Sequence, residues 1–439
     1  MRNLLPNRYR LFVVLLLIVA SFGTYARAQD STLPAEKRAL INQAISHFMA
    51  TTSVPGLSAA VVLDGHPEWS AGFGMADLEN FVPATPATLF RLASISKPIT
   101  ATAVLQLWER GKLDLDAPIQ KYCPAFPQKE SPITTRQLLG HLGGIRWYNP
   151  DHHNDVPIDS ARHFTSMEES LTVFENDPLA AKPGTKFVYS TYGYTVIGCV
   201  LEGASGQKYS DFVAENIFRP AGMNVTRTDD FFAVIPHRAR GYHQEANGAV
   251  LNAGVLDSSY KVPGGGWLSS ADDVASFAIA ILADRLLKPA TRELMWTPGK
   301  TASGEPIDYA LGWHTQNKYG LALYSHTGGQ QGTSTSILLA PERKAGIVVL
   351  TNLEGADVAS LSDQILRIVL DLPAPHPIKG IPPKPPRNLR LAVLSSPPLA
   401  ARPQDNHPLI NYLRFPLPYF PNRGTFLLRL LLLYRLWNS

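Results

Sequence analysis

The amino-acid sequence predicts a fold of the α+β class, in which a mainly antiparallel sheet is flanked by helices and carries an inserted helical region. Short apolar runs typical of strands lie near both ends of the chain, whereas residues 98–287 have a mostly helical and loop-rich pattern. The chain has 439 residues, of which 45% are apolar and 17% charged, so it can bury a large core. Strands from both ends are expected to form one sheet, with a cleft between the sheet and the inserted region.

The individual elements follow from local patterns. A helix is expected at 35–50, followed by a buried strand at 56–63 (GLSAAVVL) between Pro55 and Gly65. The remaining expected elements are a strand at 69–73, strands at 321–326, 336–339 and 346–351, and a helix at 357–370.

Residues 1–28 have the pattern of a secretory signal peptide. Four arginines and no acid accompany an apolar run from Leu11 to Ala20, and Ala26-Arg27-Ala28 forms an A-x-A cleavage site. The run is too short to span a membrane, and Gln29 stands where a lipoprotein needs cysteine. We expect cleavage after Ala28 and an exported protein, periplasmic or extracellular.

The folded domain is expected to span residues 29–371, because the composition changes at 372–439. Fourteen of the 36 prolines lie in this tail, together with nine Lys or Arg and one acid. The tail is expected to lie outside the fold, as a linker with a basic anchor or as a frameshifted reading of the true C-terminus. Arg429 and Arg435 interrupt its apolar end, which argues against a membrane helix.

The formal net charge of +4 arises from the two ends of the chain. Residues 29–371 carry 27 basic and 35 acidic side chains, so the expected folded body is acidic. Nucleic acid is therefore not an expected partner, because an acidic body is repelled by phosphate backbones.

The chain has two cysteines, Cys123 and Cys199, which are too few for a disulfide framework, although export would permit one bond. Cys199 lies in an apolar stretch. It is expected to be a small core residue rather than half of a disulfide.

The motif S-x-x-K occurs three times, at Ser94–Lys97, Ser205–Lys208 and Ser258–Lys261. In a helix, positions i and i+3 share a face, so the lysine amine reaches the serine hydroxyl. Only the first copy precedes a long apolar helical pattern. Pro98 is tolerated in a first helical turn and disrupts later ones, so this helix must begin close to Ser94.

The start of a helix suits a nucleophile. The positive end of the helix dipole favours a developing Ser94 alkoxide, and burial of Lys97 in a cleft disfavours its charged form. A neutral Lys97 then accepts the serine proton. A chance serine and lysine on a surface helix is an equal alternative for this motif alone.

Two further motifs follow in order, Tyr189-Ser190-Thr191 and His326-Thr327-Gly328-Gly329. With S-x-x-K, they resemble the Y-x-N and K-T-G or H-T-G elements of class C beta-lactamases and penicillin-recognising peptidases. LLGHLGGI at 138–145 also fits this family, and the Y-S-T and S-H-T-G-G sequences are most similar to its mitochondrial serine beta-lactamase-like proteases. The resemblance spans roughly residues 40–370 and implies a beta-lactamase/transpeptidase-like fold.

The resemblance implies a role for each matching residue. Ser94 is implied as the acylated nucleophile, Lys97 as its base, and Tyr189 as a proton donor to the leaving group. The amides of Ser94 and Gly329 are implied to form the oxyanion hole. The residues implied to line the substrate are Thr191, His326, Thr327, Gly328 and Gly329.

Two departures from the family pattern bear on the substrate. Thr191 replaces an asparagine, which removes two amide donors, and His326 replaces a lysine, which removes a permanent positive charge. Binding of the carboxylate of β-lactams and D-alanyl peptides is therefore expected to be weaker. We expect a serine hydrolase of peptides or carboxylic esters, with a beta-lactamase, a D-alanyl-D-alanine carboxypeptidase or a non-turnover penicillin-binding protein as alternatives.

Other motifs give no competing site. The chain lacks the G-x-S-x-G elbow of α/β-hydrolases. His152, His153 and His163 lack metal-ligand spacing and an obvious carboxylate partner. His141 is expected to be structural, and Gly264–Gly266 to form a tight turn near the cleft. No metal or cofactor is expected.

Overall fold

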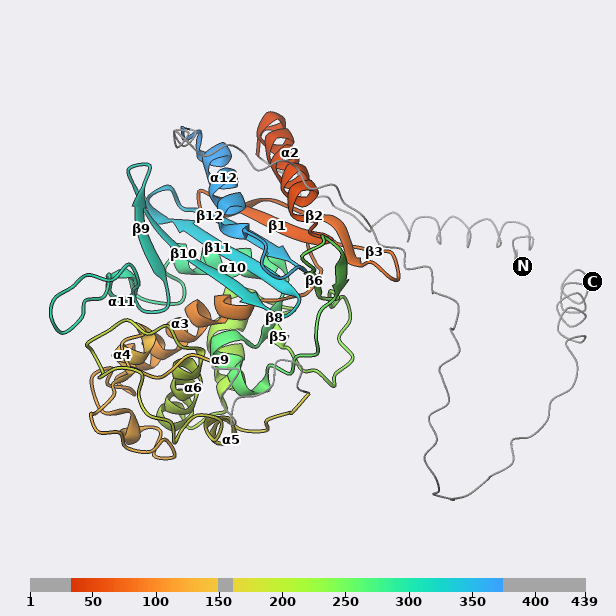
Figure 1. Cartoon of the computed structure of the whole chain (residues 1–439). Helices are drawn as coiled ribbons and strands as arrows, with labels where there is room; N and C mark the ends of the chain where they lie inside the picture. The colour runs from red at the N-terminus through yellow and green to blue at the C-terminus, as the bar shows by residue number, and fades with distance from the viewer. Residues whose placement is uncertain (1–32, 149–160, 374–439) are drawn as a thin grey trace, which may run out of the picture. The chain divides into compact units, whose positions relative to one another are not determined.

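The computed structural model describes residues 33–148 and 161–373, which contain a seven-stranded antiparallel sheet of order β3-β2-β1-β12-β11-β10-β9 (Figure 1). Its strands are β1 (Gly56–Leu63), β2 (His66–Asp77), β3 (Val82–Pro83), β9 (His314–Lys318), β10 (Leu321–Gln330), β11 (Thr333–Ala340) and β12 (Ala345–Thr351). Because β1 pairs with β12, strands from both ends of the chain form one sheet, and the predicted α+β class is confirmed.

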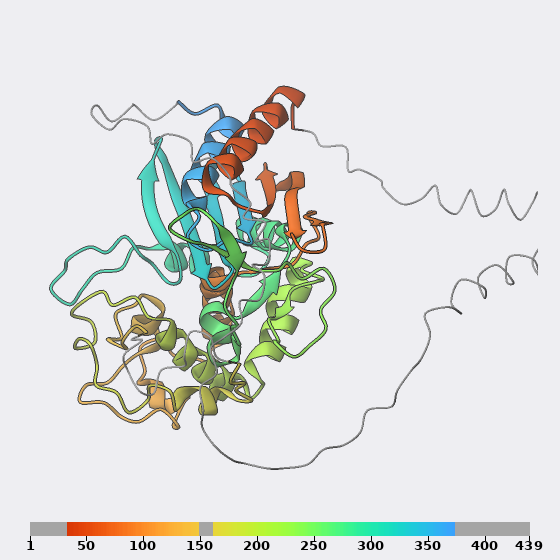
Figure 2. The same cartoon turned by 45° about the vertical axis from the view of Figure 1, so that its right-hand side comes forward.

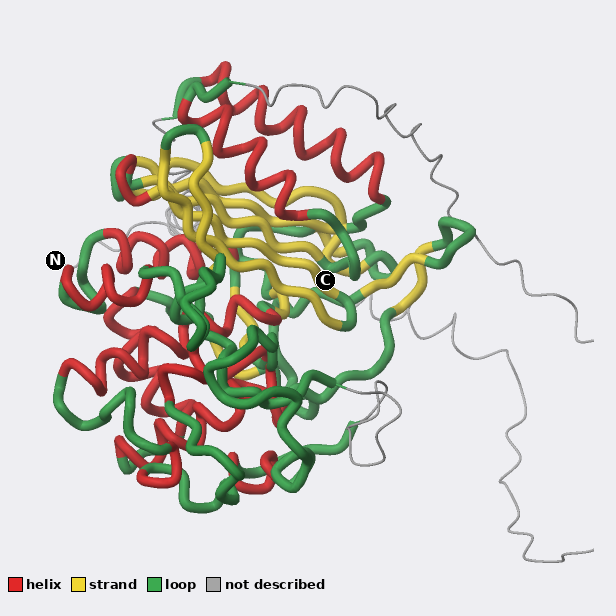
Figure 3. Tube along the Cα trace, turned by 60° about the vertical axis from the view of Figure 1, so that its left-hand side comes forward, coloured by secondary structure: helices red, strands yellow, loops and turns green. Residues whose placement is uncertain are grey.

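Helices cover both faces of this sheet (Figure 3). On one face, α2 (Ala35–Thr52) and α12 (Val358–Leu370) lie together and pack against β1 and β12. On the other face, α10 (Ala271–Leu282) contacts the same two strands. β1 is buried along nearly its whole length, which explains its unbroken apolar sequence.

The inserted helical region lies beside the second face of the sheet (Figure 2). The other helices are α3 (Ser96–Glu109), α4 (Thr135–Leu139), α5 (Met167–Leu171), α6 (Thr191–Ser205), α7 (Tyr209–Val213), α8 (Arg219–Ala221), α9 (Val262–Gly265) and α11 (Pro289–Trp296). The 3-10 helical turns are η1 (Ala93–Ile95), η2 (Ile119–Lys121), η4 (Ser259–Lys261) and η5 (Pro341–Arg343), and η3 (Ala214–Phe218) is a π-helical turn. α3 and α6 pack against each other in the centre of the region, where apolar side chains bury both helices almost completely.

Two small sheets complete the described elements. A three-stranded sheet has the order β4-β8-β5, and β6 pairs with β7. Their bounds are β4 (Phe90–Arg91), β5 (Arg227–Thr228), β6 (Tyr242–Gln244), β7 (Val250–Asn252) and β8 (Trp267–Ser269). Among the described residues, we find no helix with the length and apolar character needed to cross a membrane.

The sequence predicted most of the central sheet but not its edges. β2 is longer than the expected strand at 69–73, because glycine and polar residues interrupt its apolar pattern. β9 was not predicted, because it is an edge strand with the sequence HTQNK and no apolar residue. Residues 1–28 and nearly all of the tail lie outside the described residues, so the signal peptide and the unfolded tail stay predictions.

Cys123 and Cys199 form a disulfide, so the expectation that Cys199 is an unpaired core residue was wrong. The close approach of two segments explains the pairing. A Cβ at Gly203 of α6 would lie 1.7 Å from the carbonyl oxygen of Tyr122, so only glycine lets the Tyr122 backbone approach α6 this closely. This contact brings Cys123 to Cys199, and a spacing of 76 residues in the sequence gives no sign of it.

Loss of the disulfide is expected to lower the free energy of unfolding by about 4 kcal/mol, because the bond closes a long loop in the unfolded chain. Denaturant titration of the wild-type chain with and without a thiol reductant measures this loss. Cys199→Ser is the matched control, because the reductant has no disulfide left to break in this variant. An unchanged wild-type midpoint under reducing conditions contradicts a stabilising role for the bond.

Candidate active site

Ser94 lies in the turn that leads from β4 into α3. Residues Ala93–Ile95 form η1, and α3 begins at Ser96 with Pro98 in its first turn, as the sequence predicted. Ala93 has a φ of 48°, a left-handed conformation that is costly for a residue with a side chain. The backbone therefore holds strain immediately before the residue that is expected to react.

Lys97 is fully buried, and its amine contacts Ser94. Lys97 Nζ lies 2.9 Å from Ser94 Oγ, and it donates hydrogen bonds to Thr191 Oγ1 at 3.2 Å and to the Gly264 carbonyl oxygen at 2.8 Å. Burial, reinforced by the positive charge of Lys261, lowers the pKa of Lys97 well below its usual range. A lower pKa increases the fraction of neutral amine, which is a proton acceptor within reach of the serine hydroxyl.

Tyr189 lies beside this pair, just before α6. Its ring centroid is 4.9 Å from Lys97 Nζ. Burial raises the pKa of Tyr189, although its hydrogen bond with Ser94 acts in the opposite direction. The phenol therefore stays protonated and can donate a hydrogen bond toward the serine.

His141 supports the tyrosine rather than the nucleophile. Its ring centroid is 4.2 Å from that of Tyr189, and its Nδ1 accepts a hydrogen bond from the Ser190 backbone at 3.1 Å. Burial lowers the pKa of His141 well below its usual range, which keeps the ring neutral. This supporting position agrees with the structural role expected from the sequence.

His326 and Thr327 are neighbours on β10, but the first is buried and the second is exposed to solvent. His326 is buried, and its Nε2 lies 3.0 Å from the hydroxyl of Tyr309. Burial, together with the charges of His314 and Lys97, lowers the pKa of His326 well below its usual range. The imidazole is therefore neutral and packed inside the protein, whereas Thr327 is exposed.

Gly328 lets β10 lie directly against the backbone that precedes Ser94. A Cβ at Gly328 would lie 2.3 Å from the Leu92 carbonyl oxygen, the same oxygen that accepts a hydrogen bond from Thr335 Oγ1 at 2.8 Å. A Cβ at Gly329 would meet open space. The two glycines therefore have different physical roles despite being adjacent.

Gly328→Ala is expected to lower the free energy of unfolding by about 2 kcal/mol, because its methyl group collides with fixed backbone. Gly329→Ala is the matched control and is expected to change stability by less than about 0.5 kcal/mol. Thermal and denaturant unfolding of the two variants measures the difference. Equal stabilities would show that β10 does not depend on this close approach.

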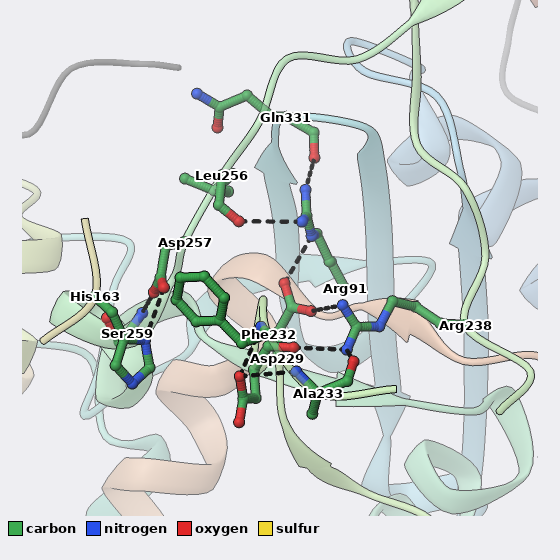
Figure 4. Close-up of polar contacts among 11 residues, drawn as sticks. Arg91, His163, Asp229, Phe232, Ala233, Arg238, Leu256, Asp257, Ser259 and Gln331 are labelled. Atoms are coloured by element: carbon green, nitrogen blue, oxygen red, sulfur yellow. Dashed lines mark hydrogen bonds and ion pairs between the residues drawn. The ribbon is translucent and has the colours of Figure 1, made fainter. Parts of the chain in front are cut away.

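An ion-pair network ties three segments of the site together (Figure 4). Arg91 Nε donates to Asp229 Oδ2 at 2.7 Å, and its other nitrogens donate to the carbonyl oxygens of Gln331 and Leu256 at 3.1 and 3.2 Å. Arg238 Nη1 lies 3.7 Å from the second oxygen of Asp229. Arg91 therefore links the strand before the nucleophile to the turn after β10 and to the segment before η4.

Three side chains near the site were missed by sequence reasoning. Tyr309 and His314 pack around His326, with the rings of His314 and His326 centred 5.2 Å apart. The third is Lys261, which belongs to a discarded S-x-x-K copy and is buried. In the sequence, the only sign that Lys261 lies near the site is its position shortly before the three glycines Gly264–Gly266. In the other discarded copy, Lys208 is exposed to solvent.

His163 has a carboxylate partner, which corrects an expectation from the sequence. Its Nδ1 lies 2.8 Å from Asp257 Oδ2, because the chain folds two distant segments together (Figure 4). His152 and His153 lie outside the described residues. Within 33–148 and 161–373, no group of three or more His, Cys, Asp or Glu side chains is arranged to hold a metal ion.

A serine next to a buried lysine at the start of the central helix, in this fold, is characteristic of beta-lactamase/transpeptidase-fold serine hydrolases. The chain belongs to the beta-lactamase family, whose model, described as Beta-lactamase, matches residues 41–370. The family resemblance inferred from the motifs is thereby confirmed.

Individual relatives agree with this assignment. The chain is similar to the human serine beta-lactamase-like protein LACTB, mitochondrial, at 34% identity over 66% of this chain and 69% of that protein. It is also similar to penicillin-binding protein 4* of Bacillus subtilis, at 31% identity over 64% of each chain. Among solved structures, the D-amino acid amidase of Ochrobactrum anthropi SV3 has a TM-score of 0.64 at 26% identity, covering 75% of this chain and 98% of that chain.

Proposed function

We propose that this protein is a serine hydrolase that forms an acyl-enzyme on Ser94 and acts on peptides or carboxylic esters. The observation that carries the proposal is the 2.9 Å contact between Ser94 Oγ and the amine of the buried Lys97. A lysine with a lowered pKa is a base at neutral pH, and a serine needs such a base to attack a carbonyl carbon.

The proposed acylation moves one proton from serine to the leaving group. Neutral Lys97 takes the proton of Ser94 as Oγ bonds to the carbonyl carbon, and the amides of Ser94 and Gly329 stabilise the oxyanion. As the bond to the leaving group breaks, Tyr189 gives its proton to that group and recovers one from Lys97. Water then attacks the acyl-enzyme by the same route in reverse, which releases the acid and restores the serine.

The surroundings of Lys97 support a positioning role for Thr191. Its hydroxyl lies 3.2 Å from Lys97 Nζ, where it holds the amine near the serine. Because the Thr191 hydroxyl is engaged with Lys97, it is less available to bind the substrate. Thr191 therefore contributes less to substrate binding than the asparagine of the family pattern would.

Two features favour peptides or esters over β-lactams. The buried and neutral His326 supplies no positive charge to a β-lactam carboxylate. In addition, Tyr309 and His314, which pack against this histidine, line a cavity of about 510 Å³ whose walls also hold Phe187 and the charged Lys186, Glu305 and Asp308. A cavity of this size with apolar and polar walls suits a substrate side chain. Penicillin recognition stays the alternative, and the similarity to penicillin-binding protein 4* supports it.

A comparison of three substrates tests the proposal: a p-nitrophenyl ester, a peptide p-nitroanilide and the chromogenic cephalosporin nitrocefin. We expect kcat/KM for the ester or the peptide to exceed that for nitrocefin by roughly tenfold or more, because one charged contact to the carboxylate is missing. Preferred turnover of nitrocefin would instead establish the beta-lactamase alternative. A burst of one equivalent without steady turnover would establish the non-turnover penicillin-binding protein.

We also propose that the hydrolase domain ends near Asp371 and that the chain is exported. The end of α12 at Leu370 supports the boundary, and the disulfide between Cys123 and Cys199 supports an oxidising compartment. N-terminal sequencing of the protein from its native source is expected to begin at Gln29. A chain that retains Met1 contradicts export by a cleaved signal.

A further inference from the structure

Lys261 is a buried cation that the proposed reaction does not use. The side chain is 5% exposed, and within the described residues it makes no hydrogen bond or ion pair. Its Nζ lies 5.6 Å from the ring centroid of Tyr148 and 5.4 Å from that of Tyr260. Cation–π contacts of this kind recover only part of the cost of removing an ammonium group from water.

The nearby carboxylates are committed to other partners (Figure 4). Asp229 lies 2.7 Å from Arg91 and 3.7 Å from Arg238. Asp257 lies 2.8 Å from His163, and its other oxygen accepts a hydrogen bond from the Ser259 backbone. Within the described residues, the fold therefore keeps a lysine in the interior and gives it no carboxylate in direct contact.

Lys261 also lies next to the catalytic residues. It ends η4, and α9 follows at once and carries Gly264, whose carbonyl oxygen accepts the hydrogen bond of Lys97. A Cβ at Gly265 would lie 3.8 Å from Cδ of Lys261, 3.8 Å from the carbonyl carbon of Ala93 and 3.5 Å from Oε1 of Gln330. Among the described residues, the buried Nε2 of the same Gln330 amide has no hydrogen-bond partner.

Lys261 and Gln330, two side chains with unused donors, thus both lie close to Gly265, as does Ala93, the residue that precedes the nucleophile. A carboxylate accepts hydrogen bonds from both an ammonium and an amide group. Tyr189, the proposed donor to the leaving group, packs instead against His141 and Tyr309. Lys261 and Gln330 are therefore assigned to the acyl half of a substrate rather than to the half that leaves.

We propose that Lys261, assisted by Gln330, binds a carboxylate on the acyl portion of the substrate, so that the enzyme prefers acidic acyl groups. The inference rests on the proposed hydrolase function and names its substrate class. In the family pattern, a lysine at the position of His326 supplies the positive charge beside the substrate, whereas His326 is neutral and buried. The proposal assigns this positive charge to Lys261 instead. The charge lies on η4, on a different element from the strand β10.

The preference is expected to depend on pH. Burial, reinforced by Arg91 and opposed by Asp229, lowers the pKa of Lys261 to about 7, and Lys97 is the other charged group facing it. Lys261 is charged below this pKa and neutral above it. The preference for an acidic acyl group is therefore expected to be full near pH 6 and to fall by up to about tenfold per pH unit above the pKa.

Paired esters that differ only in charge test the proposal on the full chain. Mono-p-nitrophenyl glutarate carries an acyl-side carboxylate, and p-nitrophenyl valerate is its neutral counterpart. Near pH 6, the wild type is expected to favour glutarate by roughly tenfold or more in kcat/KM. Lys261→Met should reduce this ratio to near one, mainly through KM, and Lys261→Arg should retain most of it.

Lys208→Met is the matched control, because this lysine has the same motif position but an exposed side chain, and it should keep the wild-type ratio. A wild type that hydrolyses both esters without preference, or a Lys261→Met variant with the full ratio, overturns the inference and leaves the proposed function standing. Hydrolysis of neither ester, together with no hydrolysis of the peptide p-nitroanilide, overturns the proposed function itself. If Lys261→Met does not fold, a wild-type ratio that stays constant between pH 6 and 8 still contradicts the inference.

Discussion

Ser94→Ala is expected to lower kcat for every substrate by roughly 10⁴-fold or more, because no other group takes over the covalent step. The substitution removes one hydroxyl from the contact with Lys97. It leaves the packing of α3 unchanged, so the variant should keep its fold. Steady-state kinetics on an ester and a peptide, with circular dichroism of the same samples, measures both effects.

Ser258→Ala is a matched control for this substitution. Ser258 also begins an S-x-x-K motif, and its buried Oγ has no hydrogen-bond partner in the part of the chain that the structure describes, so its removal is expected to retain activity within about threefold. The result that contradicts the assignment is the reverse pattern, in which Ser94→Ala stays active and Ser258→Ala does not. Such a pattern would move the nucleophile to the third motif.

Lys97→Met is expected to lower kcat/KM by roughly a thousandfold, because the serine loses its base while the apolar volume of the side chain is kept. The oxyanion donors and the nucleophile remain, so residual hydrolysis should be measurable above the uncatalysed rate. Kinetics on a p-nitrophenyl ester measures the loss. Lys208→Met, which removes an exposed lysine, should leave the rate unchanged and serves as the control.

The pH profile of the wild type gives a separate test of Lys97. Burial and the charge of Lys261 lower its pKa well below the usual range. Since the base must be neutral, kcat/KM is expected to rise with pH through this lowered pKa and then to level off. Lys97→Met should lose this rise. A variant that keeps the wild-type profile would show that another group is the base.

The local part of the site was predictable from the sequence. The pairing of Ser94 with Lys97 follows from helical spacing, and Pro98 fixed where the helix begins. The strands β1 and β12 were predictable for a similar reason, because burial on both faces leaves unbroken apolar runs. Each of these inferences depends on neighbouring residues in the chain.

The features that were missed all depend on contacts between distant segments. The neutral state of His326 arises from its burial and its contact with Tyr309, and neither is visible in the motif. The disulfide depends on the approach of Tyr122 to Gly203. Lys261 belongs to an S-x-x-K copy with no long apolar helical pattern after it, and only the folded chain places it in the interior. No local pattern encodes these contacts.

The most direct test of the acyl-enzyme claim is mass spectrometry of the chain after exposure to a fluorophosphonate and, separately, to a penicillin. We expect a covalent adduct on the peptide that contains Ser94, with more complete labelling by the fluorophosphonate. Ser94→Ala should remain unlabelled by both reagents. An adduct on a different residue, or no adduct with either reagent, would contradict the claim that Ser94 is the nucleophile.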